Sequence, residues 1–145
     1  MTAAAAPTMP PRAGLWPRFG ALFYDGFLLL ALVFVGSWLF LTLFGDASQG
    51  PVRHAYQVFL LGLCGIYLVY CWSHSGQTLG MKTWGLRVVR DDGTPLALGS
   101  AILRFALALG SVALAGAGFI WCLIDRDRQF LHDRIGGTRV VRAPI

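Results

Sequence analysis

The chain has 145 residues, of which 56% are hydrophobic and only 13% are charged, and its formal net charge is +5. Soluble domains carry about a quarter charged residues, so this composition is typical of an integral membrane protein. The positive charge is therefore expected at the cytoplasmic ends of membrane segments, and it does not indicate a nucleic-acid partner.

The chain begins with residues 1–14, which are rich in alanine and proline and predict a flexible lead-in. They are not expected to form a secretory signal, because the apolar run that follows is longer than a typical h-region of about 7–15 residues. Residues 15–142 predict a single membrane domain. Its hydrophobic segments are 19–44, 55–72 and 102–124.

The first two segments are expected to be membrane-spanning helices. At about 1.5 Å rise per residue, residues 19–44 extend roughly 39 Å and residues 55–72 roughly 27 Å, against a hydrocarbon core of about 30 Å. The polar turn 45–51 between them is too short to be a domain. The two segments therefore predict an antiparallel helical hairpin with both ends on one side of the membrane.

The third segment, 102–124, is rich in glycine and alanine, and it allows either a third span or a re-entrant hairpin. If it crosses, the Lys and Arg residues divide into six on each side of the membrane. If the segment instead turns back at its glycines, eleven Lys and Arg residues lie on one side of the membrane and only Arg53 lies on the other. The positive-inside rule therefore favours re-entry, with both termini cytoplasmic.

A repeated tetrapeptide supports the same topology. Arg-Val-Val-Arg occurs at residues 87–90 and again at residues 139–142. Two short strands can pair only on the same face of the membrane, and a lone strand is only marginally stable. The fold class predicted is thus an all-α integral membrane protein with a small two-stranded cytoplasmic β element.

One acid, Asp25, lies within the first hydrophobic segment, seven residues after Arg18. At helical spacing these two residues share a face but lie roughly 10 Å apart, too far for a direct bond. Because the uncharged run 26–44 nearly spans the membrane alone, Asp25 is expected at the inner boundary, level with Arg104. We expect Arg104 to be its cation. Asp25 is then either half of an ion pair that clamps the first helix to the third segment, or a proton or cation site.

Several short motifs occur in a fixed order after these residues. Gly-Gln-Thr-Leu-Gly (76–80) precedes Leu-Arg-Val-Val (86–89), and Gln-Phe-Leu-His-Asp (129–133) precedes Gly-Thr-Arg-Val-Val (137–141). With Arg18 and Asp25, these motifs resemble the RDD family, a group of small multi-pass membrane proteins, mostly bacterial, named for one arginine and two aspartates. The resemblance covers about residues 15–142.

The resemblance implies that Arg18, Asp25 and Asp133 are the naming residues, and that Arg104 matches a further arginine at the start of the third segment. One departure is that Met81 separates Gly80 from Lys82, whereas family members often carry Gly-Lys. The family's molecular function is largely unassigned, and transport of an unknown ligand is a hypothesis.

Residues 76–83 do not form a phosphate loop, because only three residues separate the glycines and Met81 precedes the lysine. We interpret Gln77 and Thr78 as residues of a tight turn that satisfies backbone groups where the second helix ends. Asp133 is interpreted as a capping or turn acid. Its neighbour His132 is expected to titrate near neutral pH.

A metal site formed by His74, His132 and Asp133 has no recognised ligand spacing, so no metal or cofactor is expected. No catalytic arrangement is evident, and an enzyme is not expected.

The leading functional hypothesis is a multi-pass protein of the bacterial inner membrane that takes part in transport of an unknown ligand or ion. The alternative is a non-transporting interaction or assembly module with a basic cytoplasmic face. Two or three helices cannot enclose a solute path. Transport therefore predicts a homo-oligomer or a larger membrane complex within the lipid bilayer.

Overall fold

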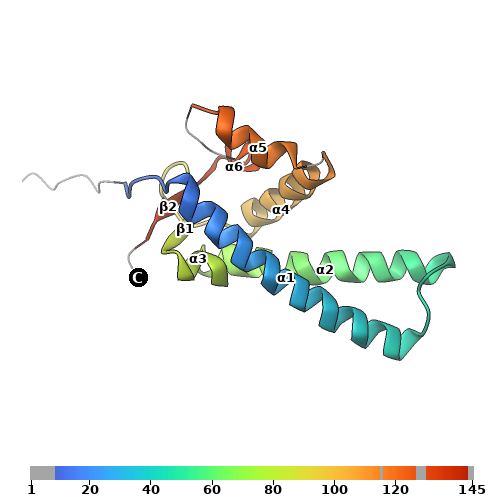
Figure 1. Cartoon of the computed structure of the whole chain (residues 1–145). Helices are drawn as coiled ribbons and strands as arrows, with labels where there is room; N and C mark the ends of the chain where they lie inside the picture. Colours follow the sequence, from blue (N-terminus) through green and yellow to red (C-terminus); the bar gives the residue numbers. More distant parts are fainter. Residues whose placement is uncertain (1–8, 115, 127–129, 144–145) are drawn as a thin grey trace, which may run out of the picture.

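The computed structural model of the chain describes residues 9–114, 116–126 and 130–143, so the first eight residues of the predicted lead-in lie outside the described part. The described chain is mostly helical, with two short strands (Figure 1). In chain order the elements are α1 (Leu15–Phe44), α2 (Gly50–His74), α3 (Leu79–Thr83), β1 (Leu86–Arg90), α4 (Leu98–Ala113), α5 (Ala117–Ile124), α6 (Leu131–Ile135) and β2 (Thr138–Arg142).

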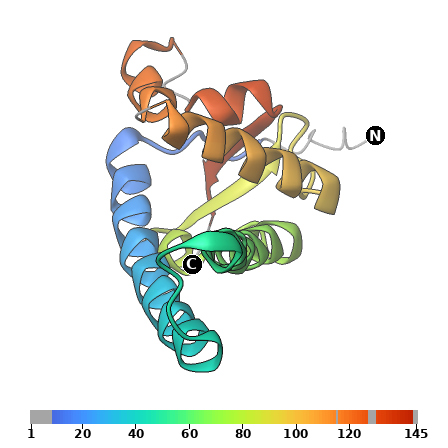
Figure 2. The ribbon, with the colours of Figure 1, turned by 90° about the vertical axis from the view of Figure 1, so that its right-hand side faces the viewer.

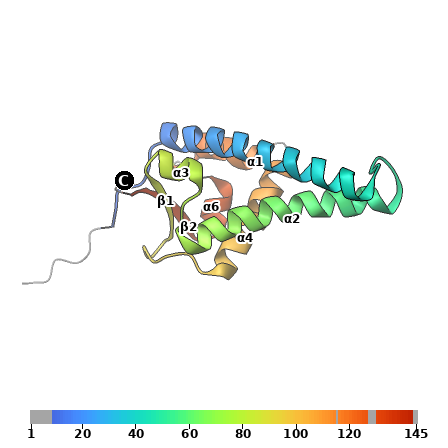
Figure 3. The ribbon, with the colours of Figure 1, turned by 90° about the horizontal axis from the view of Figure 1, so that it is seen from below.

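Helices α1 and α2 form the predicted hairpin and project together from the rest of the molecule (Figures 1 and 3). Both are long and apolar enough to cross a membrane. Near the tip, Phe40 packs against the rings of Tyr56 and Phe59, each with its centroid at 5.3 Å. A Cβ added at Gly36 would lie 2.6 Å from a methyl of Leu63, so the glycine allows the helices to approach closely.

The outward face of α1 carries a stripe of large exposed side chains at helical spacing. These are Phe23, Phe27, Leu30, Phe34 and Trp38, all at least 60% exposed. Soluble monomers rarely expose so large a contiguous apolar surface, whereas a lipid environment favours it.

The strands β1 and β2 pair antiparallel, with Val88 opposite Val140. The prediction that the two Arg-Val-Val-Arg repeats form one small sheet is therefore confirmed. Residues 11–13, at the end of the predicted lead-in, lie along the free edge of β2: Ala13 N–H donates to the carbonyl of Val140 at 3.1 Å. We call the unit formed by α3, β1, α6 and β2 the lobe.

The third hydrophobic segment is not one continuous helix. Helix α4 ends at Ala113 and α5 begins at Ala117, with Gly116 between them at φ +76°, in the left-handed region that favours glycine. A single straight span over residues 102–124 is therefore not formed. Helix α4 packs on α2 and lies across the base of the hairpin (Figure 2).

The core of the protein lies where the hairpin meets the lobe. Its buried members include Ala21 of α1, Trp72 of α2, Leu86 and Val88 of β1, Ala101 of α4 and Val140 of β2. These residues come from elements far apart in the chain, so the sheet, α4 and the roots of both long helices are packed as one unit.

Candidate functional site

Six polar residues predicted from the sequence gather at this junction and are almost completely buried. They are Arg18 (2% exposed), Asp25 (6%), Thr78 (1%), Arg104 (2%), His132 (4%) and Asp133 (0%). Charged groups removed from water need partners, so the contacts of each residue indicate its role.

Asp25 joins α1 to α3. Its carboxylate accepts a hydrogen bond from the hydroxyl of Thr78 and another, of 2.9 Å, from the backbone N–H of Gly80. Thr78 also caps α3, because its Oγ1 accepts a hydrogen bond from Met81 N–H at 3.2 Å. A Cβ added at Gly80 would lie 2.4 Å from the carbonyl oxygen of Ala21, so only glycine allows α3 to pack this closely on α1.

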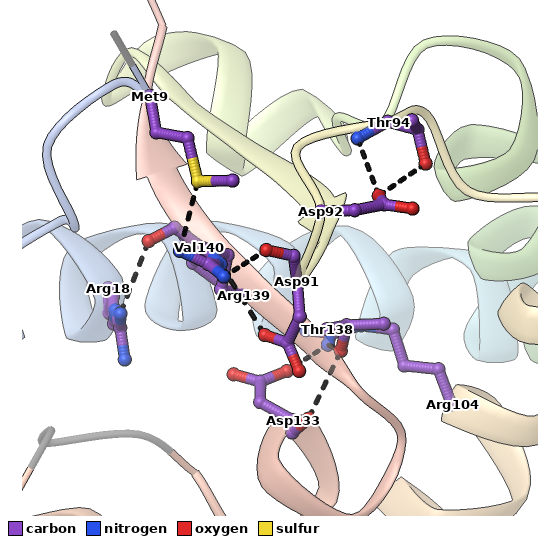
Figure 4. Close-up of polar contacts among 10 residues, drawn as sticks. All are labelled: Met9, Arg18, Asp91, Asp92, Thr94, Arg104, Asp133, Thr138, Arg139 and Val140. Atoms are coloured by element: carbon purple, nitrogen blue, oxygen red, sulfur yellow. Dashed lines mark hydrogen bonds and ion pairs between the residues drawn. The ribbon is translucent and has the colours of Figure 1, made fainter.

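The prediction that Arg104 is the cation of Asp25 is wrong. Arg104 Nη1 instead forms an ion pair with Asp133 Oδ1 and donates a 2.9 Å hydrogen bond to Thr138 Oγ1 (Figure 4). Its guanidinium also lies over the ring of Trp72, at 4.8 Å from the centroid. Arg104 therefore joins α4 to the lobe rather than to α1.

Asp133 was interpreted as a capping or turn acid, and its position agrees only in part. It lies in the first turn of α6, as a capping acid would, but the cap position itself belongs to Phe130. The Asp133 side chain is fully buried and pairs with Arg104.

Arg18 joins the first turns of α1 to the sheet. Its Nη2 donates to the carbonyl oxygen of Val140 at 3.2 Å (Figure 4). Its guanidinium lies 5.9 Å from the ring centroid of Phe130. The three residues that the resemblance implies as the naming residues thus each connect different elements: α1 with β2, α1 with α3, and α4 with α6.

The loop that carries Gln77 connects α2 to β1 as predicted. Gln77 Nε2 donates to the carbonyl of Leu86 at 2.6 Å, and the carbonyl of Gly76 accepts from Val88 N–H at 2.7 Å. Gly76 has φ +68°. The interpretation of Gln77 and Thr78 as turn residues that satisfy backbone groups is confirmed, but residues 79–83 of the stretch 76–83 form helix α3 rather than a turn.

His132 does not titrate near neutral pH, contrary to the prediction. Its ring stacks on Phe130 at 5.5 Å, and its Nε2 lies 3.6 Å from Asp133 Oδ1. Burial, and then the positive charges of Arg104 and Arg18, lower the pKa of His132 from 6.5 to about 3. The imidazole is therefore neutral at pH 7.

This shift predicts that the protein loses stability in acid. Between pH 6.5 and about 3 the unfolded chain binds a proton at His132 and the folded chain does not. As far as it depends on His132, the free energy of unfolding is therefore expected to be highest above pH 6.5 and to fall as the pH drops toward 3. Thermal unfolding in mild detergent at about pH 7.5 and about pH 5 measures the effect.

Two variants assign the acid effect to this residue. His132→Gln is expected to reduce the difference between the two pH values, whatever its own cost in stability. His54→Gln, at an exposed position on α2, is expected to leave the difference unchanged. If His132→Gln retained the full difference, the assignment to His132 would be incorrect.

The three residues weighed as a metal site are not all brought together. His132 and Asp133 are neighbours, but His74 is exposed on α2 and stacks on Tyr70 at 4.2 Å. Within residues 9–114, 116–126 and 130–143, no group of three His, Cys, Asp or Glu side chains is placed to hold a metal ion.

A cavity of about 670 Å³ lies between α1, α2 and α4. Its walls are mainly apolar, and the end nearest the lobe is bounded by Arg18, Asp25, Thr78, Arg104 and His132. Toward the hairpin tip its lining residues Leu61 and Val112 are 46% and 60% exposed, so the cavity opens onto the outer surface of the helices. A site with apolar walls and a few convergent polar groups is typical of ligand binding.

Sequence reasoning missed three residues of this junction: Trp72, Gly80 and Thr138. Gly80 belongs to the 76–80 motif, and Thr138 directly follows two glycines before β2, so both had a local signal. Trp72 had none, because an aromatic residue at the end of an apolar helix is also typical of a membrane interface.

Comparisons with known proteins agree with the motifs. Residues 12–137 match the RDD family. Two Bacillus subtilis (strain 168) proteins are each 29% identical to this chain: uncharacterized protein YckC, over 90% of this chain and 85% of the relative, and uncharacterized protein YxaI, over 92% and 99%. No solved structure matches the chain significantly. Since the matched range contains every buried charged residue described above, the resemblance is confirmed, and the chain belongs to the RDD family.

Proposed function

We propose that this protein lies in the bacterial inner membrane, with α1 and α2 spanning the bilayer and the lobe on the cytoplasmic side. The length and apolar surface of the two helices support the spans. The paired strands require the chain on both sides of α4 and α5 to lie on one face of the membrane. Arg53 lies near the hairpin tip, whereas the lobe is rich in arginine, which supports a cytoplasmic lobe.

Cysteine labelling tests this topology. In a variant whose native cysteines are replaced, Ser48→Cys at the hairpin tip is expected to react with a membrane-impermeant reagent in intact cells. Ala143→Cys, just after β2, is expected to react only after the inner membrane is opened. Labelling of Ala143→Cys from the periplasmic side would contradict the proposed orientation.

The proposed function is participation in transport, with the cavity as the place where the ligand or ion is held. One observation carries this proposal: the cavity leads from the apolar surface of the helices to buried charged residues, and Asp25 lies at its inner end. Intramembrane acids commonly mark ion or substrate pathways. Because two long helices cannot enclose a path, the proposal includes a homo-oligomer or a larger complex, and it requires no cofactor, catalytic step or nucleic acid.

Flux measurements with Asp25→Asn test this proposal. Asparagine keeps an oxygen that accepts from Gly80 N–H, and its amide can donate to Thr78 Oγ1, so the contact between α1 and α3 is expected to persist. Membrane insertion is then retained, while proton- or cation-coupled flux into reconstituted vesicles is expected to fall by at least about 10-fold, because the charge is lost.

Asp46→Asn is the matched control, since Asp46 lies in the exposed turn between α1 and α2. It is expected to keep full flux. If Asp25→Asn fails to assemble while no flux depends on the residue, Asp25 is a structural contact and the transport proposal is incorrect.

A second candidate function is a membrane interaction or assembly module. It is favoured by exposed cations on the lobe and on residues 11–13 beside β2, namely Arg12, Lys82, Arg87, Arg90 and Arg142. Such residues attract anionic lipid headgroups or an acidic partner. The oligomeric state after mild detergent extraction separates the two functions. A strict monomer would argue against a transport pore but would be compatible with an interaction or assembly module.

A further inference from the structure

The chain reverses its direction between α4 and α5. Helix α4 runs toward the hairpin tip, and α5 returns toward the lobe (Figure 1). Gly116, at φ +76°, lies between them in the left-handed region that glycine adopts readily. We call residues 98–124 the short hairpin, and α4 and α5 its two limbs.

Both ends of the short hairpin are fastened to the lobe. Arg104, in the second turn of α4, pairs with Asp133 of α6. Asp125, directly after α5, pairs with Arg134 of α6. No charged residue occurs between Arg104 and Asp125. The uncharged part of the segment therefore leaves the lobe and comes back to it.

The length of each limb matches half of a bilayer. Nine residues separate Arg104 from the end of α4 at Ala113, which is roughly 14 Å, and the eight residues of α5 extend roughly 12 Å. Half of the hydrocarbon core is about 15 Å. Arg104 lies over the ring of Trp72, near the end of α2, so the first limb starts level with the root of the long hairpin.

The first limb packs against the apolar middle of α2. A Cβ added at Gly65 would lie 2.8 Å from the ring of Phe105, so the two helices are in close contact there. Farther toward the hairpin tip, Val112 of α4 and Leu61 of α2 line the same cavity. Gly65 lies nine residues, or roughly 14 Å, before His74 at the end of α2. If α2 spans the bilayer, these contacts hold α4 at the depth of the acyl chains.

The outward surface around the turn and along α5 is apolar. Five large side chains there are each at least 56% exposed, namely Val112, Leu114, Ile120, Leu123 and Ile124. Exposure of this surface to water is unfavourable, whereas contact with acyl chains is not.

The backbone of the turn is also suited to hydrocarbon, where polar groups must be paired within the protein. The N–H of Leu114 donates to the carbonyl of Gly110, and the N–H of Gly116 donates to the carbonyl of Ser111, both at 3.1 Å. The hydroxyl of Ser111 donates to the carbonyl of Leu107 at 3.0 Å. These groups therefore need no water.

We infer that the short hairpin is a re-entrant element embedded in the cytoplasmic leaflet, and that lipid acyl chains cover its outward surface. The turn at Gly116 lies near the middle of the bilayer, and neither limb crosses it. The inference rests on the proposed placement of α1, α2 and the lobe, and it extends that placement to the third hydrophobic segment. It does not depend on transport.

Depth measurements with single spin labels test the inference. The three native cysteines are replaced, and one cysteine is then introduced at an exposed position and labelled with a nitroxide. The positions are Ile102, Val112, Leu114, Ile120 and Ile124. In phosphatidylcholine vesicles, collisions of the label with oxygen and with a polar nickel chelate are measured. Phe34→Cys on α1 is the reference for hydrocarbon, and Ser48→Cys in the exposed turn is the reference for water.

The ratio of oxygen to nickel collisions increases with depth. At Leu114 it is expected to be at least about 10-fold higher than at Ser48, because hydrocarbon excludes the polar chelate. It is expected to equal the ratio at Phe34. Along the short hairpin the ratio is expected to rise from Ile102 to Leu114 and to fall again at Ile124.

A third span would also be deepest at its middle, so a second measurement determines the side of the membrane. Arg126→Cys, at an exposed position directly after α5, is expected to react with a membrane-impermeant maleimide only after the inner membrane is opened. Arg53→Cys is the matched control near the long hairpin's tip, and it is expected to react in intact cells. Circular dichroism and gel filtration in detergent verify that each variant is folded.

Four outcomes would overturn the inference. Nickel collisions at Leu114 as frequent as those at Ser48 would place the short hairpin at the membrane surface. Reaction of Arg126→Cys in intact cells would make the segment a third span. A label at Leu114 that neither oxygen nor nickel reaches would assign the outward surface to a second copy of the chain. Water-like collisions at Phe34 would defeat the placement of α1, and the inference with it.

The depth profile also separates this inference from the transport proposal. If flux does not depend on Asp25, the transport proposal fails, but the expected profile is unchanged because it depends only on where the segments lie. If the profile contradicts re-entry while flux still depends on Asp25, the inference fails and the transport proposal stands.

Discussion

Replacement of Asp133 with alanine is expected to lower the free energy of unfolding by about 3–5 kcal/mol, the usual cost of leaving one member of a buried ion pair uncompensated. Asp133 is fully buried and Arg104 is 2% exposed, so water cannot replace the lost carboxylate. Thr138 Oγ1 remains as an acceptor for Arg104, but a neutral hydroxyl does not balance its charge. Thermal or denaturant unfolding in mild detergent measures the loss.

Two further variants separate the ion pair from a general effect of substitution. Asp91→Ala removes the carboxylate that pairs with Arg139, but the Asp91 side chain is 59% exposed, so the change is expected to stay within about 0.5 kcal/mol. The double variant Arg104→Met/Asp133→Leu removes both charges and is expected to regain most of the stability that Asp133→Ala loses. A double variant as unstable as the single one would show that the ion pair is not the source of the loss.

Gly80→Ala is expected to lower the free energy of unfolding by about 1–3 kcal/mol. The added Cβ would lie 2.4 Å from the Ala21 carbonyl oxygen and 2.8 Å from Asp25 Oδ1. The backbone of α1 cannot move aside as a flexible side chain can, so α3 must shift and lengthen the hydrogen bond from Gly80 N–H to Asp25. The measurement is again unfolding in detergent.

The matched control for Gly80 is Gly99. Each glycine is the second residue of its helix, but a Cβ added at Gly99 would meet nothing within 4 Å. Gly99→Ala is expected to be neutral or to stabilise the protein by up to about 1 kcal/mol, since alanine has the higher helix propensity. Equal losses in the two variants would mean that the close approach of α3 to α1 is not what requires glycine at position 80.

Much of the fold was predictable because its signals are local. The two long helices follow from uninterrupted apolar runs, and the β element follows from the repeated Arg-Val-Val-Arg. The glycine-rich stretch of the third segment predicted a turn, and the helix does break at Gly116. Family membership was also predictable, since its motifs are short and ordered.

The partners of the buried charges were not predictable in the same way. The sequence predicts that Asp25 and Arg104 both lie near one membrane boundary, and from their charges alone they are then expected to pair. In the folded protein Asp25 meets Thr78, 53 residues away, and Arg104 meets Asp133, 29 residues away. Which partner each of these residues meets depends on the path of α4 across the base of the hairpin, and no local sequence pattern specifies that path. The low pKa of His132 has the same origin, since it depends on burial and on Arg104 and Arg18.

The sequence by itself determined that this protein is a member of the RDD family with two helices able to span a membrane and a two-stranded sheet, whereas it left the third segment open between a span and a re-entrant hairpin. Apolar periodicity, turn residues and motif order are properties of neighbouring residues, so they can be read from the chain. The tertiary structure decided that Arg18, Asp25 and Asp133 connect helices to the lobe, and that they do so around a cavity. Both facts arise only when α1, α2, α4 and the sheet pack together, because each contact joins elements that are distant in the sequence.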